Sequence, residues 1–210
     1  MAAVDFSRFA SVLRDLDVAG EVRALPEPAP SAAAAAAQLG CEVGAIANSL
    51  VFAADGEPLL VMTSGAHRVD TARVAALIGA CAVSRADAKS VRAWTGQVIG
   101  GVAPVGHPAP IRTLVDAWLA KYDVVWAAAG HPYTVFPTSF DELVRITGGT
   151  AAEVGELPGQ ARSEGGAFLA AVVGYLVRVV DPGPGQPAPR AGFGDGDVPR
   201  LRLVVDVGDG

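Results

Sequence analysis

The stretch GAIANSLVF, residues 44–52, is almost entirely apolar or small and predicts a strand that runs through a core. Its middle residue, Asn48, breaks this pattern. Side chains alternate along a strand, so Asn48 would share a face with Ile46, Leu50 and Phe52. A buried amide without hydrogen-bond partners costs about 1–3 kcal/mol. Asn48 therefore needs either a partner within the core or a role in a site.

The composition indicates a globular chain with one main core. Of its 210 residues, 51% are hydrophobic and 18% are charged, which excludes a disordered chain. No apolar run reaches the roughly 18–20 residues of a membrane span, because the longest candidate, residues 168–180, is shorter and contains Arg178. The N-terminus lacks the apolar stretch of a signal peptide. Cys41 and Cys81 form no CxxC motif, so we expect two buried thiols in a reducing cytosol.

Charge is distributed unevenly along the chain, whose net charge is −6. Residues 58–122 contain 7 Lys and Arg against 3 Asp and Glu, a net of +4, whereas the segments on either side are each −5. A basic middle segment can face a polyanion, or it can be ordinary scatter of surface charge. The sequence leaves both interpretations open, but a pI of about 5.0 argues against binding DNA or other nucleic acids without regard to sequence.

Caps, turns and apolar spacing divide residues 5–149 into helices and strands. Asp55-Gly56 predicts a tight hairpin. Helix starts are predicted at residue 5 and at the caps Ser31, Asp70, Ser84 with Asp87, and Thr138 with Asp141. Helix ends are predicted at Gly20, Gly40, Gly79, Gly96 and Gly148. Strands are predicted at residues 21–25, 44–52, 58–63, 124–129 and 134–137.

Residues 98–110, VIGGVAPVGHPAP, predict a rigid loop with exposed backbone. Loop amides that face a cavity can hold a carbonyl oxygen or a carboxylate, although such a loop can equally be a plain connection. The apolar residues of segment 111–122, which follows, recur with a helical period. The three histidines lack metal-ligand spacing, and the chain contains no GxSxG elbow or phosphate loop. We therefore expect no metal ion and no cofactor.

The character of the chain changes near residue 155. Residues 181–197 are rich in proline and glycine and are typical of a linker. Residues 201–207, LRLVVDV, are a candidate strand with no evident partner. We expect one domain over residues 1–155 and a poorly structured or unassigned extension over residues 156–210.

Four ordered blocks of sequence resemble one known family. The blocks are residues 33–52, 59–80, 95–107 and 124–149. They are similar to the YbaK/EbsC family, the free-standing relatives of the editing domain inserted in bacterial prolyl-tRNA synthetases. The resemblance covers about residues 5–155. It implies an α/β (α+β) fold, a curled, mixed, mostly antiparallel sheet with surrounding helices, and it makes residues 111–115 a strand.

The resemblance implies an aminoacyl-tRNA deacylase that acts in trans and in the cytoplasm. Its members hydrolyse mischarged tRNA such as Cys-tRNA(Pro) or Ala-tRNA(Pro). The implied partners are the 3′ end of an aminoacyl-tRNA and an aminoacyl-tRNA synthetase, with no membrane and no DNA. An aminoacyl ester is already activated, so positioning the carbonyl and admitting one water can suffice. Specificity would come from pocket size, which rejects larger side chains.

The resemblance also assigns the site residues. The family's GxxxP loop falls on Gly100 to Pro104, and its second pocket turn falls on Gly130 and His131. The candidate catalytic residues, which would position the ester, are Asn48, Gly100 and Gly101. The candidate substrate-binding residues are Ser64, His67, Val102, Pro104, Gly130 and His131.

Two departures from the family pattern matter. Asn48 stands where the family has a lysine, and Ala128 stands where many members have a serine. Asparagine is neutral and cannot act as a base, although it can donate a hydrogen bond. The sequence therefore leaves open a catalytically inactive module that binds tRNA, a synthetase or a small ligand. An unrelated enzyme on the same fold, and an Asn48 satisfied by core backbone, also remain open.

Overall fold

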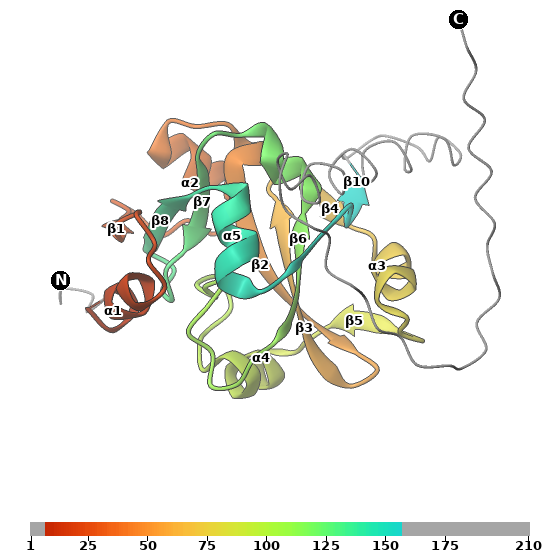
Figure 1. The fold of residues 1–210 in the computed structure, drawn as a ribbon. Coiled ribbons are helices and arrows are strands. Elements are labelled where there is room, and N and C mark those ends of the chain that lie inside the picture. Colours follow the sequence, from red (N-terminus) through yellow and green to blue (C-terminus); the bar gives the residue numbers. More distant parts are fainter. Residues whose placement is uncertain (1–6, 157–210) are drawn as a thin grey trace, which may run out of the picture. The chain divides into compact units, whose positions relative to one another are not determined.

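The computed structural model of this chain describes residues 7–156 (Figure 1). Its helices are α1 (Ser7–Asp15), α2 (Ala32–Leu39), α3 (Thr71–Ile78), α4 (Ala88–Thr95) and α5 (Phe140–Thr147), with 3-10 turns η1 (Val43–Ala45) and η2 (Ala117–Lys121). Its strands are β1 (Arg23–Ala24), β2 (Ile46–Ala54), β3 (Glu57–Ser64), β4 (Arg68–Val69), β5 (Val83–Arg85), β6 (Arg112–Asp116), β7 (Val125–Ala128), β8 (Thr134–Thr138), β9 (Thr150–Ala152) and β10 (Gly155–Glu156). The strand predicted at residues 201–207 lies outside the described residues.

The main sheet is mixed and has the order β1-β8-β7-β2-β3-β6-β9, with β5 also paired to β2. Four of its strand pairs are antiparallel, and the pairs β2–β7, β3–β6 and β6–β9 are parallel. The predicted hairpin at Asp55-Gly56 joins β2 to β3, and both residues have positive φ, as a two-residue turn of this kind requires. Strands β4 and β10 form a separate pair.

Strand β2 lies at the centre of the sheet, and one of its edges is interrupted. On one side β2 pairs with β3 from Ala47 to Ala54. On the other side β7 pairs with residues 46–47 and β5 with residues 52–54, so each flanks a different part of β2 (Figure 1). Between them, among the described residues, only the Val51 carbonyl is bonded on this edge, by the Ala86 N–H at 3.2 Å. Residues 48–50 therefore border a gap between two neighbouring strands.

Two separate core clusters cover the same face of β2. One contains Ile46 and is completed by the alanines of α2 and by Trp126 of β7. The other contains Phe52 and is completed by Val74 of α3 and by strands β3, β6 and β9. Asn48 shares this face by alternation and falls between the clusters. Its position is therefore a boundary of the core rather than its interior.

Several predicted helix boundaries are confirmed, and others are wrong. Ser31 and Asp70 cap α2 and α3 as predicted. Helix α4, however, is capped by Asp87 alone, whose carboxylate accepts a first-turn N–H at 2.7 Å, because Ser84 is paired within β5. Helix α5 is capped by Ser139 rather than Thr138, which still belongs to β8. A cap side chain must reach an amide two or three residues ahead. The residue immediately before the helix is therefore the one that caps it.

Helix α1 also ends earlier than predicted. It ends at Asp15, and the left-handed Asp17 (φ 52°) turns the chain away. Gly20 has a different role, because a Cβ at that position would collide with the Pro137 carbonyl oxygen of β8. The glycine therefore permits a close approach of the chain to the sheet rather than ending the helix.

The helical period of residues 111–122 is misleading. Residues Arg112–Asp116 form β6, between β3 and β9, and a 3-10 turn follows. The strand implied by the family resemblance is therefore confirmed, and the helix prediction is wrong because sheet pairing outweighs the local period. The prediction of two buried thiols is also wrong, since Cys41 is partly exposed and Cys81 is exposed.

Candidate functional site

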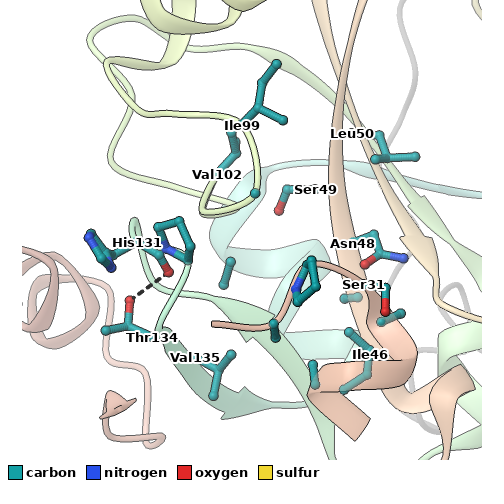
Figure 2. Close-up of a pocket in the computed structure, with 18 of the residues that line it drawn as sticks. Ser31, Ile46, Asn48, Ser49, Leu50, Ile99, Val102, His131, Thr134 and Val135 are labelled. Carbon is teal, nitrogen blue, oxygen red and sulfur yellow. Dashed lines mark hydrogen bonds between the residues drawn. The ribbon is translucent and has the colours of Figure 1, made fainter. Parts of the chain in front are cut away.

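A cavity of about 280 Å³ opens where the edge of β2 is interrupted. Its walls come from the start of α2, from β2, from β5, from the loop 99–102 and from the segment between β7 and β8 (Figure 2). Ligand pockets span roughly 300–1,000 Å³, so this cavity lies near the small end of that range. It suits a small group rather than a large cofactor.

Asn48 lines this cavity and is half-buried. Its side chain lies on the side of Ser31, Ile46 and Leu50 (Figure 2). Within residues 7–156 its amide makes no side-chain hydrogen bond, so the interpretation that core backbone satisfies it is wrong. The amide keeps two donors and one acceptor available to a ligand.

Ser49 also lines the cavity, from the opposite face of β2, and faces Ile99 and Val102 (Figure 2). Its hydroxyl lies 3.3 Å from the Met62 sulfur. The Ile46 carbonyl accepts the Gly65 N–H at 2.7 Å, which fixes the register of hydrogen bonds between β2 and β3. In an antiparallel pair these bonds alternate, so the N–H and C=O of Ser49 point away from β3 and into the gap.

Sequence reasoning missed Ser49. The signal was present in the strand alternation, which sets Ser49 on the face opposite Asn48, but the interruption of the β2 edge depends on distant strands. Without that interruption the Ser49 main chain would be paired within the sheet.

The glycine loop reaches the cavity through Gly100 and Val102, which line it. Gly100 has a φ of 90°, a conformation that only glycine adopts without strain. A Cβ at Gly101 would lie 2.6 Å from the carbonyl carbon of His131, so Gly101 packs directly against the turn after β7. Pro104 is buried and lies at a separate cavity beside His107. The two halves of the predicted site, the loop and the turn, are therefore brought together, whereas Pro104 is not part of this cavity.

The turn between β7 and β8 forms the far wall. Gly130 has a φ of 86° and precedes His131, which lines the cavity. The His131 carbonyl accepts hydrogen bonds from the N–H and the hydroxyl of Thr134 at 3.0 and 3.2 Å (Figure 2). The His131 Nδ1 accepts the Tyr133 N–H at 3.3 Å, and the two rings are stacked. These contacts hold the ring of His131 and leave its Nε2 available.

Ser64 and His67 lie in a different place. Asp116 is buried, and its carboxylate accepts hydrogen bonds from Thr63 Oγ1 at 3.3 Å, Ser64 N at 3.0 Å and His67 Nδ1 at 2.8 Å. Its second oxygen accepts the Trp118 N–H at 3.1 Å. The Ser64 hydroxyl donates to the Gly44 carbonyl at 2.8 Å. Neither Ser64 nor His67 lines the cavity.

The described residues offer little to a metal ion. No group of three or more His, Cys, Asp or Glu side chains is placed to hold a metal within residues 7–156. In the same part of the chain, no helix has the length and apolar character needed to cross a membrane.

The family model for the aminoacyl-tRNA editing domain matches residues 26–146, more than half of the chain. The chain therefore belongs to the aminoacyl-tRNA editing domain family, and the resemblance to YbaK/EbsC relatives is confirmed. Membership links the chain to tRNA as a partner and to the fidelity of translation.

Curated relatives match over a shorter stretch. The proline–tRNA ligase of Nitratidesulfovibrio vulgaris (strain Hildenborough) is 33% identical over 88 residues, which cover 42% of this chain and 15% of the ligase. The proline–tRNA ligase of Leuconostoc citreum is 35% identical over 85 residues, which cover 40% of this chain and 14% of the ligase. The chain thus corresponds to a small part of each ligase.

Solved structures match over most of the described residues. The crystal structure of a candidate trans-editing enzyme for prolyl tRNA synthetase has a TM-score of 0.69 and 34% identity, covering 74% of this chain and 99% of that one. The crystal structure of a hypothetical protein, APE2540, has a TM-score of 0.65 and 28% identity, covering 70% and 97%. These matches confirm the predicted α/β fold with its mixed, mostly antiparallel sheet.

Proposed function

We propose that this chain is an aminoacyl-tRNA deacylase that acts in trans on tRNA charged with a small amino acid, such as Cys-tRNA(Pro) or Ala-tRNA(Pro). The observation that carries the proposal is the convergence of unpaired polar groups at one small cavity. The Asn48 amide, the main-chain groups of Ser49 and the loop at Gly100 all border it. Asn48 and Ser49 are half-buried, and no fully buried side-chain polar atom lacks a partner among the described residues, so the Asn48 donors and acceptor are reachable by a ligand in the cavity.

The reaction needs positioning more than it needs a strong base. Donors from Asn48, from the backbone of Ser49 and from the loop at Gly100 hold the ester carbonyl and the terminal ribose. The Gly101 N–H is not one of these donors, because it donates to the Val98 carbonyl at 3.1 Å. The oxygen of an admitted water attacks the carbonyl carbon, the bond between that carbon and the ribose oxygen breaks, and a proton from the water passes to the leaving ribose oxygen. The products are the free amino acid and a tRNA with a free 3′-terminal hydroxyl. Donors aimed at the developing oxyanion lower the barrier, because charge accumulates there in the transition state.

The size of the cavity would determine which amino acid is removed from the tRNA. The wall residues Ala128, Pro132 and Val102 carry small or rigid side chains, and the volume of about 280 Å³ must also admit part of the terminal nucleoside. A larger side chain would need the loop and the turn to separate, and Gly101 packs them against each other. We therefore expect cleavage to fall as the side chain of the amino acid grows.

The direct test is a panel of tRNAs charged with Ala, Cys, Ser, Pro and Val. Hydrolysis of the ester is followed by the release of radiolabelled amino acid, and circular dichroism verifies that the protein is folded. We expect faster release of at least one small amino acid than in buffer alone, and slower release of valine. A folded protein that accelerates none of these hydrolyses would overturn the proposal.

A second function is favoured by the neutral residue at position 48. Asn48 brings no charge to the cavity, and His131 is the one histidine among the described residues that line it. Such a cavity also suits a catalytically inactive module that binds tRNA, a synthetase or a small ligand. Asn48→Lys separates the two functions, and Val124→Lys adds the same charge at an exposed position outside the cavity. Deacylation by Asn48→Lys but not by the natural chain or by Val124→Lys would show that the natural chain is not a deacylase of that substrate, and would favour the binding module.

Other expectations remain proposals. We propose the domain boundary at residue 155, a cytoplasmic location, a synthetase as a further partner, and the absence of a cofactor. The extension predicted after residue 155 lies, from residue 157 on, outside the described residues.

A further inference from the structure

The cavity differs in charge from the chain that surrounds it. The chain carries 22 Asp and Glu residues, but none of those within residues 7–156 lines this cavity. Its lining contains a single side chain with a permanent charge, Arg85 of β5. A cation in the lining of a concave surface, with no carboxylate in the described lining, favours an anionic group there, although the net charge of the chain is −6.

Arg85 is exposed, and no residue within the described part of the chain neutralises its charge. Within residues 7–156 its guanidinium takes part in no ion pair and donates no hydrogen bond. The Cζ atom of Arg85 lies 6.0 Å from the centroid of the Phe52 ring, near the limit of a cation–π contact. A guanidinium that rests on a ring keeps its N–H donors free for a bidentate contact with an anion.

The register places Arg85 on the same face as Asn48. Arg85 pairs with Phe52, which lies four residues further along β2, so the two positions are about 13 Å apart along the strand. Both residues line the same cavity. If the ester of a ligand lies at Asn48, the part of the ligand that reaches Arg85 is therefore some distance away from that ester.

We propose that Arg85 binds a backbone phosphate at the 3′ end of the substrate tRNA, and that it is a positioning residue rather than a catalytic one. This inference rests on the proposed function, in which the ester lies at Asn48. The anionic groups of a tRNA end that lie beyond the esterified ribose are its phosphodiesters. Arginine recognises phosphate through two parallel N–H donors, and in this cavity no carboxylate competes with the phosphate.

The test compares a substrate with phosphates to one without them. The substrates are Ala-tRNA(Pro) and 3′-O-alanyl-adenosine, and the variants are Arg85→Gln and Arg85→Lys. Arg92→Gln is the matched control, because Arg92 is exposed on α4, does not line the cavity and carries the same charge. We expect Arg85→Gln to raise the KM for Ala-tRNA(Pro) about tenfold, as the loss of a charge-assisted hydrogen bond predicts, with Arg85→Lys between it and the natural chain.

The phosphate-free substrate distinguishes phosphate binding by Arg85 from a structural role of Arg85. Cleavage of 3′-O-alanyl-adenosine should stay within about twofold in Arg85→Gln, whereas a structural defect would slow both substrates alike. The salt dependence for Ala-tRNA(Pro) should also become shallower, by a slope of about 0.7 for one lost phosphate contact. Equal losses on the two substrates, no loss on Ala-tRNA(Pro), or an equal effect of Arg92→Gln would each overturn the inference.

A binding measurement separates this inference from the proposed function. Fluorescence anisotropy of a labelled single-stranded RNA ending in CCA needs no catalysis. If the natural chain cleaves neither substrate, the deacylase proposal fails, and the RNA affinity alone decides the role of Arg85. A roughly tenfold weaker affinity in Arg85→Gln but not in Arg92→Gln would support it. Equal affinities in the two variants would reject it.

Discussion

Two groups of polar residues lie next to each other in this sheet and differ in how far their hydrogen-bonding groups are paired. The Asp116 cluster, defined as Thr63, Ser64, His67, Asp116 and Trp118, is nearly dry, and each oxygen of its central carboxylate is hydrogen-bonded. The cavity group, defined as Asn48, Ser49, Arg85 and His131, retains donors and acceptors without partners among the described residues. Thr63 is the register partner of Asn48, so the two groups meet across one strand pair.

The difference shows how the hydrogen bonds of a polar residue near a core indicate its role. In the Asp116 cluster, the side chains hold the ends of β3 and β6 together, since Asp116 ends β6 and accepts bonds from the end of β3. In the cavity group, Ser49 Oγ contacts the Met62 sulfur and His131 Nδ1 accepts the Tyr133 N–H, whereas the side chains of Asn48 and Arg85 make no hydrogen bond within residues 7–156. A satisfied group indicates a structural role, and an unsatisfied group at a cavity indicates a ligand.

The largest effect that we expect is on stability, from Asp116→Ala. The substitution leaves the hydroxyl of Thr63 and the donors of Ser64 and His67 without an acceptor. We expect a loss of about 3–5 kcal/mol in the free energy of unfolding, measured by urea denaturation. Asp123→Ala removes an exposed carboxylate and should change stability by less than about 0.5 kcal/mol. If Asp116→Ala is too unstable to purify, Asp116→Asn should show an intermediate loss, and a loss below about 1 kcal/mol would contradict the structural role.

The next effect concerns the contact between the loop and the turn. In Gly101→Ala the new Cβ would lie 2.6–2.7 Å from backbone atoms of His131 and Pro132. Backbone atoms cannot move aside as a side-chain end can, so we expect about 1–3 kcal/mol of destabilisation and a displaced cavity wall. Gly100→Ala is the contrast, because nothing lies within 4 Å of its Cβ and only its φ of 90° is strained. Equal stability of Gly101→Ala and the natural chain would show that the loop is not held against the turn.

A smaller effect on stability is expected from Asn48→Ala, in contrast to Asp116→Ala. The Asn48 amide has no hydrogen bond to lose, so the free energy of unfolding should change by less than about 0.5 kcal/mol. Deacylation or binding of the aminoacyl end should nevertheless weaken about tenfold if the amide holds the ester. A stability loss above about 1 kcal/mol would show that Asn48 belongs with the satisfied residues of the core.

The smallest effect is a dependence of stability on pH, from His107. The His107 ring shares a feature with each group. Its Nε2 is hydrogen-bonded to the Ala103 carbonyl at 2.9 Å, as the polar atoms of the Asp116 cluster are bonded, but the residue is only partly buried, as are Asn48 and Ser49 of the cavity group. Burial lowers the pKa of His107 from its ordinary value of 6.5, and the hydrogen bond opposes this shift. Below pH 6.5 the unfolded chain therefore takes up a proton before the folded chain does, and stability falls as the pH is lowered from 6.5 towards the folded pKa. His107→Gln should flatten this slope in urea denaturation between pH 5 and 7, and an unchanged slope would contradict the assignment.

Much of the fold could be predicted from local signals. The apolar stretch around Asn48, the Asp55-Gly56 turn and the caps Ser31 and Asp70 each determine an element through contacts within a few residues. The segment 111–122 could not be predicted in this way, because β6 exists only by pairing with β3 and β9, and its own period favours a helix. The resemblance to a family supplied that strand, since it carries information about the whole sheet.

The site could be predicted only in part. Sequence blocks indicated Asn48, Gly100, Val102 and His131, and all four line one cavity. Ser64 and His67 were indicated by the same resemblance, but their polar atoms are used by Gly44 and Asp116, which are distant in sequence. Arg85 was not indicated at all, because its importance depends on the absence of carboxylates around a cavity that distant segments build. Which polar groups remain unpaired is a property of the complete fold.

The interrupted edge of β2 has a consequence for how this site tolerates change. The N–H and C=O of Ser49 face the gap because β7 and β5 flank it, and not because of the side chain at that position. A substrate group held by these main-chain atoms is held whatever side chain mutation brings to residues 48 and 49. We therefore propose that this site can change the side chain at position 48 and still hold a ligand through the main chain of Ser49.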